Sequence, residues 1–349
     1  MKVLHLLQSN RFSGAENVVF QIISMFKETD NVDMVYCSRD GQIREAAKEH
    51  GVNYVPIQAL SVTEVKRVIH EQQPDIIHAH DMRASFVAAR ACGNIPLISH
   101  VHNNNFDSRG LSAKSIAYLL AAMKAKHIFW VSESSFNGYA FHKCFEKKST
   151  VLYNIIDVDA LYRRMSEDDN AYDYDVLYVG RLTYQKNPQR LMRVFEKVAS
   201  KLPDVKIGII GAGDLEKEIV ALCEELHLQK QVTFLGFQAN PLKMLHDAKM
   251  MIMTSRWEGT PMCALEAMAL GVPIVSTPTD GLCELITDGE NGFLSDDDDV
   301  LVQKVADIIT DSSLHSALSE KTKEMARQLN EVAPYREKIR RAYENCFEK

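Results

Sequence analysis

Short apolar segments, many of them rich in β-branched residues, alternate with stretches of helical pattern along almost the whole chain. Helices of the second half are expected to begin at Pro188, Asp214, Leu242, Pro261 and Val300. Strands that alternate with helices form βαβ units, so the pattern predicts an α/β protein with doubly wound parallel sheets. The predicted strands are residues 3–7, 32–37, 54–57, 76–80, 96–102, 128–132, 151–155, 176–179, 205–210, 232–237, 250–254 and 273–276.

The alternation is interrupted at residues 163–175 by the polar and acidic sequence RRMSEDDNAYDYD. A segment without periodicity between two regular patterns is typical of an interdomain connection. A chain of 349 residues is also too long for one ordinary core. We therefore predict one Rossmann-like domain over residues 1–162, a linker over 163–175, a second domain over 176–333 and a final helix over 334–349.

The composition, with 46% apolar and 25% charged residues, is typical of a soluble globular protein. The seven cysteines are odd in number, scattered and never spaced CxxC, so they indicate neither a disulfide framework nor a zinc knuckle. The apolar start of the chain is too short for a secretory signal, and no apolar run is long enough to span a bilayer. A net charge of −7 argues against nucleic-acid binding. These features together predict a cytoplasmic protein.

Residues 256–276, RWEGTPMCALEAMALGVPIVS, combine a turn, a helix and a strand. Gly259 suits the corner of the turn, Thr260 is a candidate N-cap, and Pro261 suits the first helical position. The run from Met262 to Leu270 consists of good helix formers and is apolar on almost every side, which predicts a buried helix.

The N-terminus of this helix is a candidate binding site, because unpaired amides and the helix dipole attract an anion or a group of hydroxyls. Glu258 and Glu266 flank it. The sequence leaves open whether the two carboxylates bind a ligand or pair with Arg or Lys side chains.

Two cations, Arg181 and Lys186, lie in the loop between a predicted strand and the helix that begins near Pro188. Arg offers a fork of donors and Lys a point charge, which together suit a diphosphate beside a helix N-terminus. The alternative is a pair of solvated cations on a surface loop.

Ser13 and Glu16, after the first strand, have the spacing of a capping box and indicate a well-capped helix. Gly14 in the same turn would let backbone amides approach a phosphate. Neither this loop nor residues 211–214 carries the GxGxxG pattern, which disfavours a dinucleotide-dependent dehydrogenase.

Two HxH pairs follow neighbouring strands, in HAHD at residues 78–81 and SHVHNN at residues 99–104. Imidazoles two apart on a strand point to one side, so the pairs are compatible with a metal-dependent hydrolase. Against this, Asp81 is the one obvious carboxylate at a strand end that could complete a dinuclear site. The alternatives are histidines packed and hydrogen-bonded under a helix, and a single His102 that faces a cleft and acts through a hydrogen bond or its charge.

Several segments resemble retaining glycosyltransferases of family 4, which have the GT-B fold of two Rossmann-like domains facing across a cleft. The resemblance covers nearly the whole chain, and the EGTPMCALEAM block is its most specific part. It rests on SGAE at 13–16, PDIIHAH at 74–80, VHN at 101–103, VSES at 131–134, YNIID at 153–157, GRLTYQKN at 180–187, GAGD at 211–214, VTFLGF at 232–237, EGTPMCALEAMALGVPIV at 258–275 and GLCELITDGENGFL at 281–294.

The resemblance implies a hexosyltransferase that uses a nucleotide diphosphate sugar, with UDP as the expected nucleotide, and it implies roles for the matching residues. Arg181 and Lys186 would hold the diphosphate, and Glu258 would accept hydrogen bonds from the transferred sugar. Glu266 would bind the ribose, and His102 would contact the sugar near the reacting centre. The remaining donor contacts implied are Gly14 at the phosphates, Gly213 and Phe237 near the base, and Gly259, Thr260, Pro261 and Met262 at the sugar and phosphates.

In this family retention is thought to proceed by front-face departure and attack, in which the leaving phosphate helps to deprotonate the acceptor. The resemblance therefore implies no protein nucleophile, no cofactor and no metal ion, and a final helix that crosses back to the first domain. The two glutamates are not expected to act as the acid and nucleophile of a glycosidase. Two residues depart from the family pattern: Ser13 replaces a glycine, and Ile155 replaces the glycine of YNGVD.

Two pairs match the DxD metal pattern of GT-A enzymes, namely Asp157 with Asp159 and Asp173 with Asp175, but one lies in YNIID and the other in the predicted linker. Residues 296–299, four aspartates, are interpreted as a solvated helix start.

The acceptor is expected to be a saccharide or a lipid-linked saccharide of a bacterial surface polysaccharide, because many family members act on such acceptors. Residues 109–126 have an apolar face with Arg109, Lys114, Lys124 and Lys126, which suits docking on an anionic inner membrane leaflet. Ordinary packing with solvated lysines is the alternative. A catalytically silent sugar-nucleotide-binding protein and the metal-dependent hydrolase remain as alternative functions.

Overall fold

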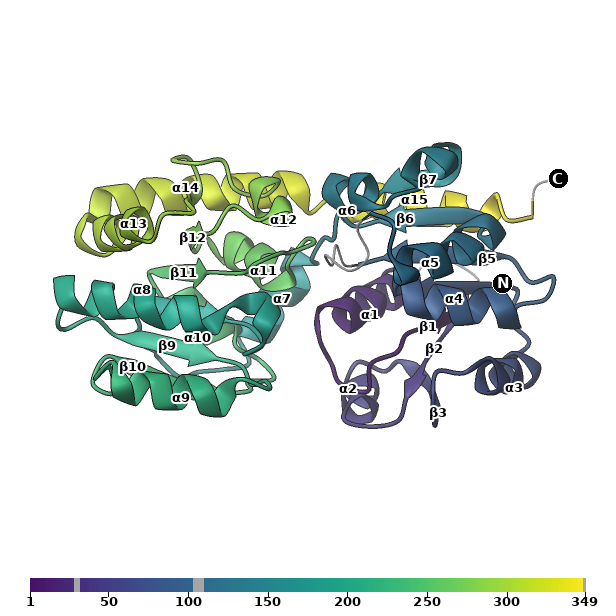
Figure 1. Cartoon of the computed structure of the whole chain (residues 1–349), viewed down its shortest axis with the longest axis horizontal. Coiled ribbons are helices and arrows are strands. Elements are labelled where there is room, and N and C mark those ends of the chain that lie inside the picture. The colour runs from purple at the N-terminus through teal and green to yellow at the C-terminus, as the bar shows by residue number, and fades with distance from the viewer. Residues whose placement is uncertain (28–31, 103–109, 348–349) are drawn as a thin grey trace. The chain divides into compact units, whose positions relative to one another are not determined.

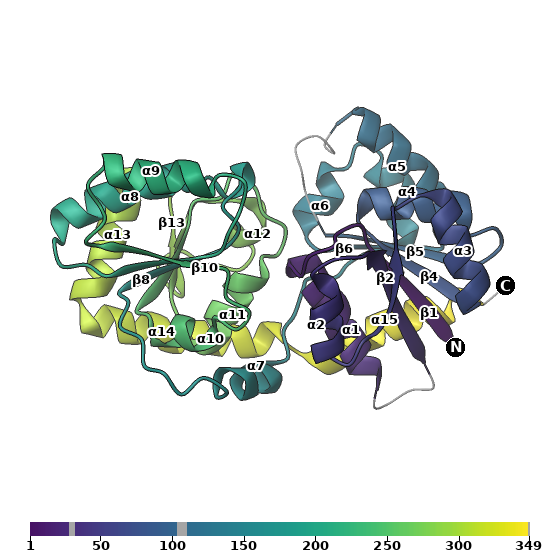
Figure 2. The ribbon, with the colours of Figure 1, turned by 90° about the horizontal axis from the view of Figure 1, so that it is seen from below.

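The computed structural model describes residues 1–27, 32–102 and 110–347. The chain forms two compact units, one made of Met1–Ile155 with Glu331–Lys349 and the other of Ile156–Asn330. Each unit is a parallel β-sheet with helices on both faces (Figures 1 and 2). The predicted fold class of two Rossmann-like domains is therefore confirmed.

The first unit contains a seven-stranded parallel sheet in the order β3-β2-β1-β4-β5-β6-β7. Helices α3, α4 and α5 cover one face, and α1 and α15 cover the other (Figure 2). The elements are β1 (Lys2–Leu6), α1 (Gly14–Lys27), β2 (Asp33–Arg39), α2 (Ile43–Glu49), β3 (Asn53–Ile57), α3 (Val62–Gln72), β4 (Ile76–His80), α4 (Asp81–Ala91), β5 (Leu97–Val101), α5 (Ala113–Lys124), β6 (His127–Trp130), α6 (Glu133–Gly138), the 3-10 helix η2 (His142–Lys148), β7 (Ser149–Val151) and α15 (Val332–Glu344).

Successive residues of a strand point to opposite faces, and the two faces of this sheet differ in chemistry. Leu4 and Leu6 of β1 face the aliphatic core under α3, α4 and α5. His5, between them, is fully buried on the other face, in register with the buried Tyr36 of β2 and in ring contact with His78 and His80 of β4. The face under α1 and α15 is therefore aromatic and imidazole-rich instead of aliphatic.

The second unit contains a six-stranded parallel sheet in the order β10-β9-β8-β11-β12-β13. Helices α8, α9 and α13 cover one face, and α10, α11 and α14 cover the other (Figure 2). The elements are α7 (Val158–Met165), β8 (Val176–Val179), η3 (Tyr184–Lys186), α8 (Pro188–Lys201), β9 (Ile207–Ile210), α9 (Glu216–Glu225), β10 (Val232–Gly236), α10 (Leu242–Asp247), β11 (Met250–Met253), α11 (Met262–Leu270), β12 (Ile274–Ser276), α12 (Asp280–Cys283), β13 (Gly292–Leu294), α13 (Asp298–Thr310) and α14 (Ser312–Leu329).

Every predicted strand is present within a few residues, and one further strand, β13, was missed. With three residues it is too short to show an alternating pattern. Helix α11 is buried as predicted, but Pro261 and not Thr260 is its N-cap, and the helix ends at Gly271 in the left-handed conformation.

The predicted linker is wrong in position. The chain passes between the units at Ile155–Ile156 and again at Asn330–Glu331, whereas residues 163–175 belong to the second unit. Part of that segment is the end of α7, a short helix in which Leu161 alone is buried. A helix with one buried residue has no apolar stripe, so its sequence reads as a loop. The final helix α15 packs within the first unit, beside α1.

Candidate functional site

The second unit places the predicted cations and carboxylates at the carboxyl edge of its sheet, where the strand order reverses. From β8 the chain continues to β9 and β10 on one side, and from β11 it continues to β12 and β13 on the other. Ligands of open parallel sheets bind outside such a reversal. Lys186 follows β8 and Glu258 follows β11, so the two side chains come from the two strands that flank the reversal.

Lys186 and Glu258 form a buried ion pair. The Lys186 ammonium donates to Glu258 Oε1 over 2.7 Å, and the Ser255 hydroxyl donates to the same oxygen over 2.5 Å. The two charged side chains are 11% and 5% exposed. Burial disfavours the charged ammonium, but the attraction of Glu258 outweighs this cost and the pKa of Lys186 is raised. The sequence left open whether Glu258 pairs with a cation, and the structure shows that it does.

Arg181 is exposed and has few partners. Its guanidinium reaches Gln185 Oε1 over 3.5 Å, a weak contact. Its backbone carbonyl accepts a hydrogen bond of 3.0 Å from the buried Tyr178 hydroxyl, which fixes the loop. The loop is therefore held in place while most of the guanidinium donors remain available to a ligand.

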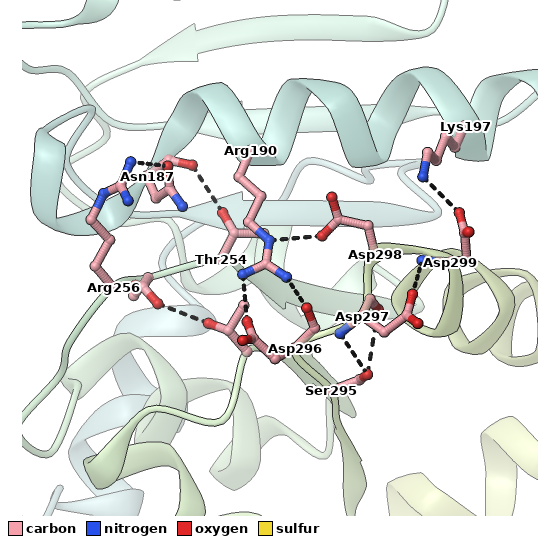
Figure 3. A network of polar contacts seen from close by, with 12 residues as sticks. Asn187, Arg190, Lys197, Thr254, Arg256, Ser295, Asp296, Asp297, Asp298 and Asp299 are labelled. Carbon is pink, nitrogen blue, oxygen red and sulfur yellow. Dashed lines mark hydrogen bonds and ion pairs between the residues drawn. The ribbon is translucent and has the colours of Figure 1, made fainter.

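Polar contacts tie the Lys186 loop to the loop that carries Glu258 (Figure 3). Asn187 stands between η3 and α8 with a φ of 54°. Its carbonyl accepts from the Thr254 hydroxyl over 3.2 Å, and its side chain accepts from Arg256 over 2.8 Å. Because Thr254 and Arg256 follow β11, the two loops that supply the ion pair are fixed to each other.

Farther along α8, Arg190 pairs with Asp296 and Asp298, each over 2.7 Å (Figure 3). Asp297 caps α13 by accepting from the Asp299 amide over 2.8 Å, which confirms that these aspartates form a helix start. A hollow of about 670 Å³ lies beside this network, and none of the predicted donor residues lines it; its lining is Asn187, Gln189, Arg190, Arg193, Arg256, Asp296 and Asp298.

The N-terminus of α11 and Glu266 have properties that suit the binding of a polar ligand. The N-cap residue of the helix, Pro261, makes no side-chain capping hydrogen bond. Within the described part of the chain, the Glu266 carboxylate makes no hydrogen bond, and burial raises its pKa to about 7 despite the opposing charge of Arg164. A partly buried carboxylate without a donor is suited to accept hydroxyl protons from a bound molecule.

Two glycines, the predicted site residue Gly213 and Gly281 opposite the predicted Gly259, allow neighbouring loops to approach closely. A Cβ on Gly213 would lie 2.3 Å from the Leu182 carbonyl oxygen, and a Cβ on Gly281 would lie 1.2 Å from the carbonyl oxygen of Gly259. Gly213 therefore lets the β9 loop pack against the loop of Arg181. Thr260, Pro261 and Met262 are buried at the start of α11, and their contact with the donor stays a prediction.

Phe237, directly after β10, is 66% exposed. An exposed aromatic ring can stack on a planar base.

In the first unit, Gly14 is the first residue of α1. The Ser13 hydroxyl donates to Glu16 Oε2 over 2.5 Å, so the two residues with capping-box spacing do interact. Glu16 is 1% exposed, and burial raises the pKa of its carboxyl group.

The two HxH pairs come together with a fifth histidine that the sequence analysis missed. His5 of β1 lies beside His78, and His80 lies beside His100, in the register of adjacent strands. His102 follows β5. All five are between 0% and 7% exposed. His5 could have been found from the alternation of β1, because it is a polar residue on a buried strand.

Burial favours the neutral form of these five histidines, the histidine cluster. Burial lowers the pKa of every one of them, and it lowers the pKa of His5 and of His102 to about 3. His102 is 7% exposed and lies at the end of the buried cluster, and its contact with a cleft stays a prediction.

Two triplets of the cluster bring nitrogens within 4.8 Å of one another, which is close enough for a metal site. The nitrogens, however, already face each other at hydrogen-bond distance: His5 Nδ1 to His80 Nε2 is 3.0 Å and His80 Nδ1 to His102 Nε2 is 2.8 Å. A tetrahedral zinc ion with bonds of 2.0–2.1 Å would hold its ligand nitrogens roughly 3.3 Å apart. The geometry therefore favours hydrogen bonding over ligation.

Asp81 is a positioning residue that the sequence analysis did not assign. It begins α4 with a φ of 70°, a conformation that is costly for a residue with a side chain. Its carboxylate accepts from the His102 backbone amide over 3.0 Å. The strained residue at the end of β4 thus fixes the chain at the end of β5.

Helix α5 carries an exposed apolar stripe. Ile116, Leu120 and Met123 are 55%, 58% and 65% exposed, and Leu111 before the helix is 79% exposed. Their spacing of four and three residues places them on one side, while the opposite side packs on α4. Arg109, which was predicted to accompany this stripe, lies outside the described residues. Among the described helices, none combines the length and the apolar character that crossing a membrane requires.

Comparison with known proteins identifies the class. Residues 12–160 match the family model described as Glycosyltransferase Family 4, and residues 164–325 match the model described as Glycosyl transferases group 1. The two models cover both units, and the chain belongs to glycosyltransferase family 4.

Individual relatives are distant. An uncharacterized glycosyltransferase of Methanocaldococcus jannaschii is 29% identical over 64% of this chain and 60% of its own length. N-acetylgalactosamine-N,N'-diacetylbacillosaminyl-diphospho-undecaprenol 4-alpha-N-acetylgalactosaminyltransferase of Campylobacter jejuni is 32% identical over 56% of this chain and 53% of its own length. The chain thus matches little more than half the length of these two relatives.

Among solved structures, Anabaena Alr3699/HepE in complex with UDP-glucose aligns with this chain at a TM-score of 0.84 and 23% identity, and the alignment covers 98% of this chain and 98% of that one. Sucrose-phosphate synthase of Thermosynechococcus elongatus covers 99% of this chain and 98% of its own, with a TM-score of 0.79 and 16% identity. These likenesses show that the fold is GT-B.

Proposed function

We propose that this protein transfers a sugar, with retention of configuration, from a nucleotide diphosphate sugar to a saccharide or lipid-linked saccharide. The observation that carries the proposal is the set of side chains at the strand reversal of the second unit. There, exposed Arg181, buried Lys186 and the uncapped start of α11 offer donors, while Glu258 and Glu266 offer acceptors.

The diphosphate is the most demanding part of such a donor, because breaking the glycosidic bond leaves negative charge on it. Arg181 supplies a fork of available donors, and Lys186 supplies a charge that its raised pKa makes permanent. Preorganised charge aimed at a developing anion is commonly the largest catalytic contribution. Because two side chains supply this charge, we propose transfer without a metal ion or other cofactor.

The ion pair gives Glu258 two tasks. It holds the Lys186 ammonium at the strand reversal through Oε1, which also accepts from Ser255, and we propose that its second oxygen, Oε2, accepts from a hydroxyl of the transferred sugar. Glu266 is proposed to bind the ribose, and Phe237, with the loop of Gly213, to meet the base. His102 and Gly14 of the first unit remain proposed contacts of the sugar and of the phosphates.

The proposed donor is UDP-linked, because Anabaena Alr3699/HepE, which shares the fold, was solved with UDP-glucose. The proposed acceptor is lipid-linked, because the Campylobacter jejuni relative is named for a diphospho-undecaprenol acceptor. The stripe of Leu111, Ile116, Leu120 and Met123 supports a peripheral contact with the inner leaflet of the membrane, since Lys124 follows at the end of the same helix. We therefore propose a cytoplasmic enzyme of cell-surface polysaccharide synthesis.

A donor screen tests the function. Thermal unfolding of the purified protein should shift upward with one UDP-sugar and less with GDP-mannose, and that donor should be hydrolysed slowly when the acceptor is absent. A shift without hydrolysis or transfer would leave the sugar-nucleotide-binding alternative. The absence of a shift with every nucleotide sugar, at concentrations far above cellular levels, would contradict the proposal.

A further inference from the structure

Three imidazoles of the histidine cluster form one continuous hydrogen-bonded chain. His5 Nδ1 lies 3.0 Å from His80 Nε2, and His80 Nδ1 lies 2.8 Å from His102 Nε2. The chain crosses three neighbouring positions of the first sheet, from β1 through the end of β4 to the residue after β5. It therefore begins in the core and ends at the carboxyl edge.

A neutral imidazole carries one proton, so the central ring donates once and accepts once. If His80 donates from Nδ1 to His102, it must accept at Nε2 from His5. If it donates from Nε2 to His5, it must accept at Nδ1 from His102. The three rings consequently share one tautomer, with every proton on Nδ1 or every proton on Nε2.

The two ends of the chain decide between these arrangements. His5 Nε2 and His102 Nδ1 are both buried without a hydrogen-bond partner among the described residues. With all protons on Nε2, the unpaired N–H would lie at His5, which is 0% exposed and beyond the reach of a ligand. With all protons on Nδ1, His5 leaves only a lone pair unpaired, and the unpaired N–H lies at His102, on the edge of the sheet. Each arrangement leaves one N–H and one lone pair unpaired, so the two differ only in which end carries the N–H. An unpaired N–H costs more when it is more deeply buried, and His102 is 7% exposed whereas His5 is 0% exposed, so the arrangement with its N–H at His102 is favoured.

We propose that His5 and His80 are positioning residues that fix the tautomer of His102, so that this ring presents an Nδ1–H donor at the carboxyl end of β5. The oxygen that accepts this hydrogen bond belongs to a bound hydroxylated molecule, and its identification with the sugar donor rests on the proposed function.

The neighbouring rings hold the chain in its plane. His78 stacks on His80 with centroids 4.3 Å apart, and His100 stacks on His102 with centroids 4.2 Å apart. The His78 ring is itself held by a contact of 2.9 Å between Nδ1 and the Tyr343 hydroxyl. Rotation of a ring in the hydrogen-bonded chain would therefore break stacking as well as hydrogen bonds. Because the rings keep their orientation, the chain can keep a single tautomer.

Nitrogen NMR of the full chain labelled with ¹⁵N-histidine tests the tautomer directly. Signals are assigned by the loss of one imidazole in each single-histidine variant. The expected result is Nδ1–H for His5, His80 and His102 at pH 7.5. An Nε2–H tautomer or an imidazolium at any of the three rings would overturn the proposal. A stoichiometric transition metal on these rings would overturn it too, because a metal ion binds unprotonated nitrogens and the hydrogen-bonded chain requires a proton on Nδ1 of each ring.

Paired substitutions of His5 separate hydrogen bonding from packing. The amide nitrogen of Asn can take the place of Nδ1 as a donor, whereas Leu fills the space without a donor. We expect His5→Asn to keep the tautomer of His102 and most of kcat, and His5→Leu to lose the single tautomer and to lower kcat roughly 10- to 100-fold, as loss of a residue that orients a catalytic imidazole does.

A purely structural role predicts the opposite order, because an apolar Leu suits a buried site better than Asn. Equal or higher kcat in His5→Leu than in His5→Asn, with both variants folded by thermal unfolding, would overturn the proposal. The control is His127→Leu, which removes a part-buried imidazole that bonds to Thr150 outside the histidine cluster and should leave the His102 tautomer unchanged; a change there would show that general packing sets the ring. If no nucleotide sugar is turned over, the proposed function fails, while the NMR result still decides the tautomer.

Discussion

Lowering the pH from 7.5 to 5 should destabilise the first unit far more than the second. The histidine cluster is held neutral by burial, with the pKa of His5 and of His102 lowered to about 3. In the unfolded chain a histidine has a pKa of about 6.5. The unfolded state therefore binds more protons between these two values, so the stability is fully present above pH 6.5 and is lost as the pH falls below it.

The magnitude follows from the two pKa values. At pH 5 a histidine of the unfolded chain is protonated, whereas His5 and His102 in the folded protein are not. The free energy of unfolding therefore falls by about 2 kcal/mol for each ring, or about 4 kcal/mol for the two. His78, His80 and His100 add to the loss in the same direction. A domain is stable by roughly 5–15 kcal/mol, so this loss is a large part of the total.

Two buried carboxyl groups act in the opposite sense. Burial raises the pKa of Glu16 in the first unit and raises that of Glu266 in the second to about 7. Each binds its proton more readily in the fold, so each contributes stability as the pH falls. In the first unit, one carboxyl group offsets only part of the effect of five histidines. In the second unit, as the structure describes it, no buried histidine opposes the effect of Glu266.

The two tryptophans allow the units to be followed separately, because Trp130 is buried in β6 and Trp257 follows β11. Denaturant unfolding of Trp257→Phe, followed by the fluorescence of Trp130, should give a midpoint that falls steeply between pH 7.5 and 5. Hydrogen exchange of peptides from both sheets provides the same comparison in the unmodified chain. The control is His70→Gln, which removes an exposed histidine of α3 and should leave the pH dependence unchanged. Equal loss of stability in the two units would refute the reasoning.

Four further outcomes are expected. Lys186→Met should lower kcat, and it should destabilise the second unit by about 3–5 kcal/mol because Glu258 is left buried without its cation. The double variant Lys186→Met/Glu258→Gln should recover stability but not activity. If the single variant is as stable as the unmodified protein in denaturant titrations, the buried ion pair is contradicted. The KM for the donor should rise as the pH falls from 8 to 6, because Glu266 becomes protonated, and Glu266→Gln should show a high KM without this dependence. Leu120→Glu should weaken sedimentation with anionic vesicles, while Val220→Glu, at an exposed position of α9, should not; equal binding would exclude α5 as the docking surface. Transfer should persist in EDTA after extensive dialysis, and a loss that a divalent metal restores would refute the metal-independent proposal.

Much of the fold could be predicted from the sequence because its information is local. Buried parallel strands are continuous apolar runs, and each predicted run is a strand. The linker was misplaced because α7 buries only Leu161, and the crossing at Ile155–Ile156 lies among apolar residues that resemble a strand end. A domain boundary depends on which contacts a segment makes, and these do not appear in its composition.

The candidate site residues Lys186 and Glu258 could be predicted, because each is a charged residue in a loop that directly follows a predicted strand. The sequence could not show that these two side chains pair, because 72 residues separate them. The alternation of β1 could have placed His5 on a buried face, but not its partners, because these come from β4. The role of Asp81 could not be assigned, because its left-handed conformation is unusual for any residue other than glycine.

The return of the last helix to the first unit has a consequence for the order of folding during synthesis. The second unit, Ile156–Asn330, is contiguous and can complete its core as soon as it leaves the ribosome. The first unit is made earlier but lacks α15 until the rest has been translated, and Tyr343 of that helix supplies the hydroxyl beside His78. Until then its imidazole-rich face is open to water, so the half of the enzyme that is synthesised first should be the half that matures last.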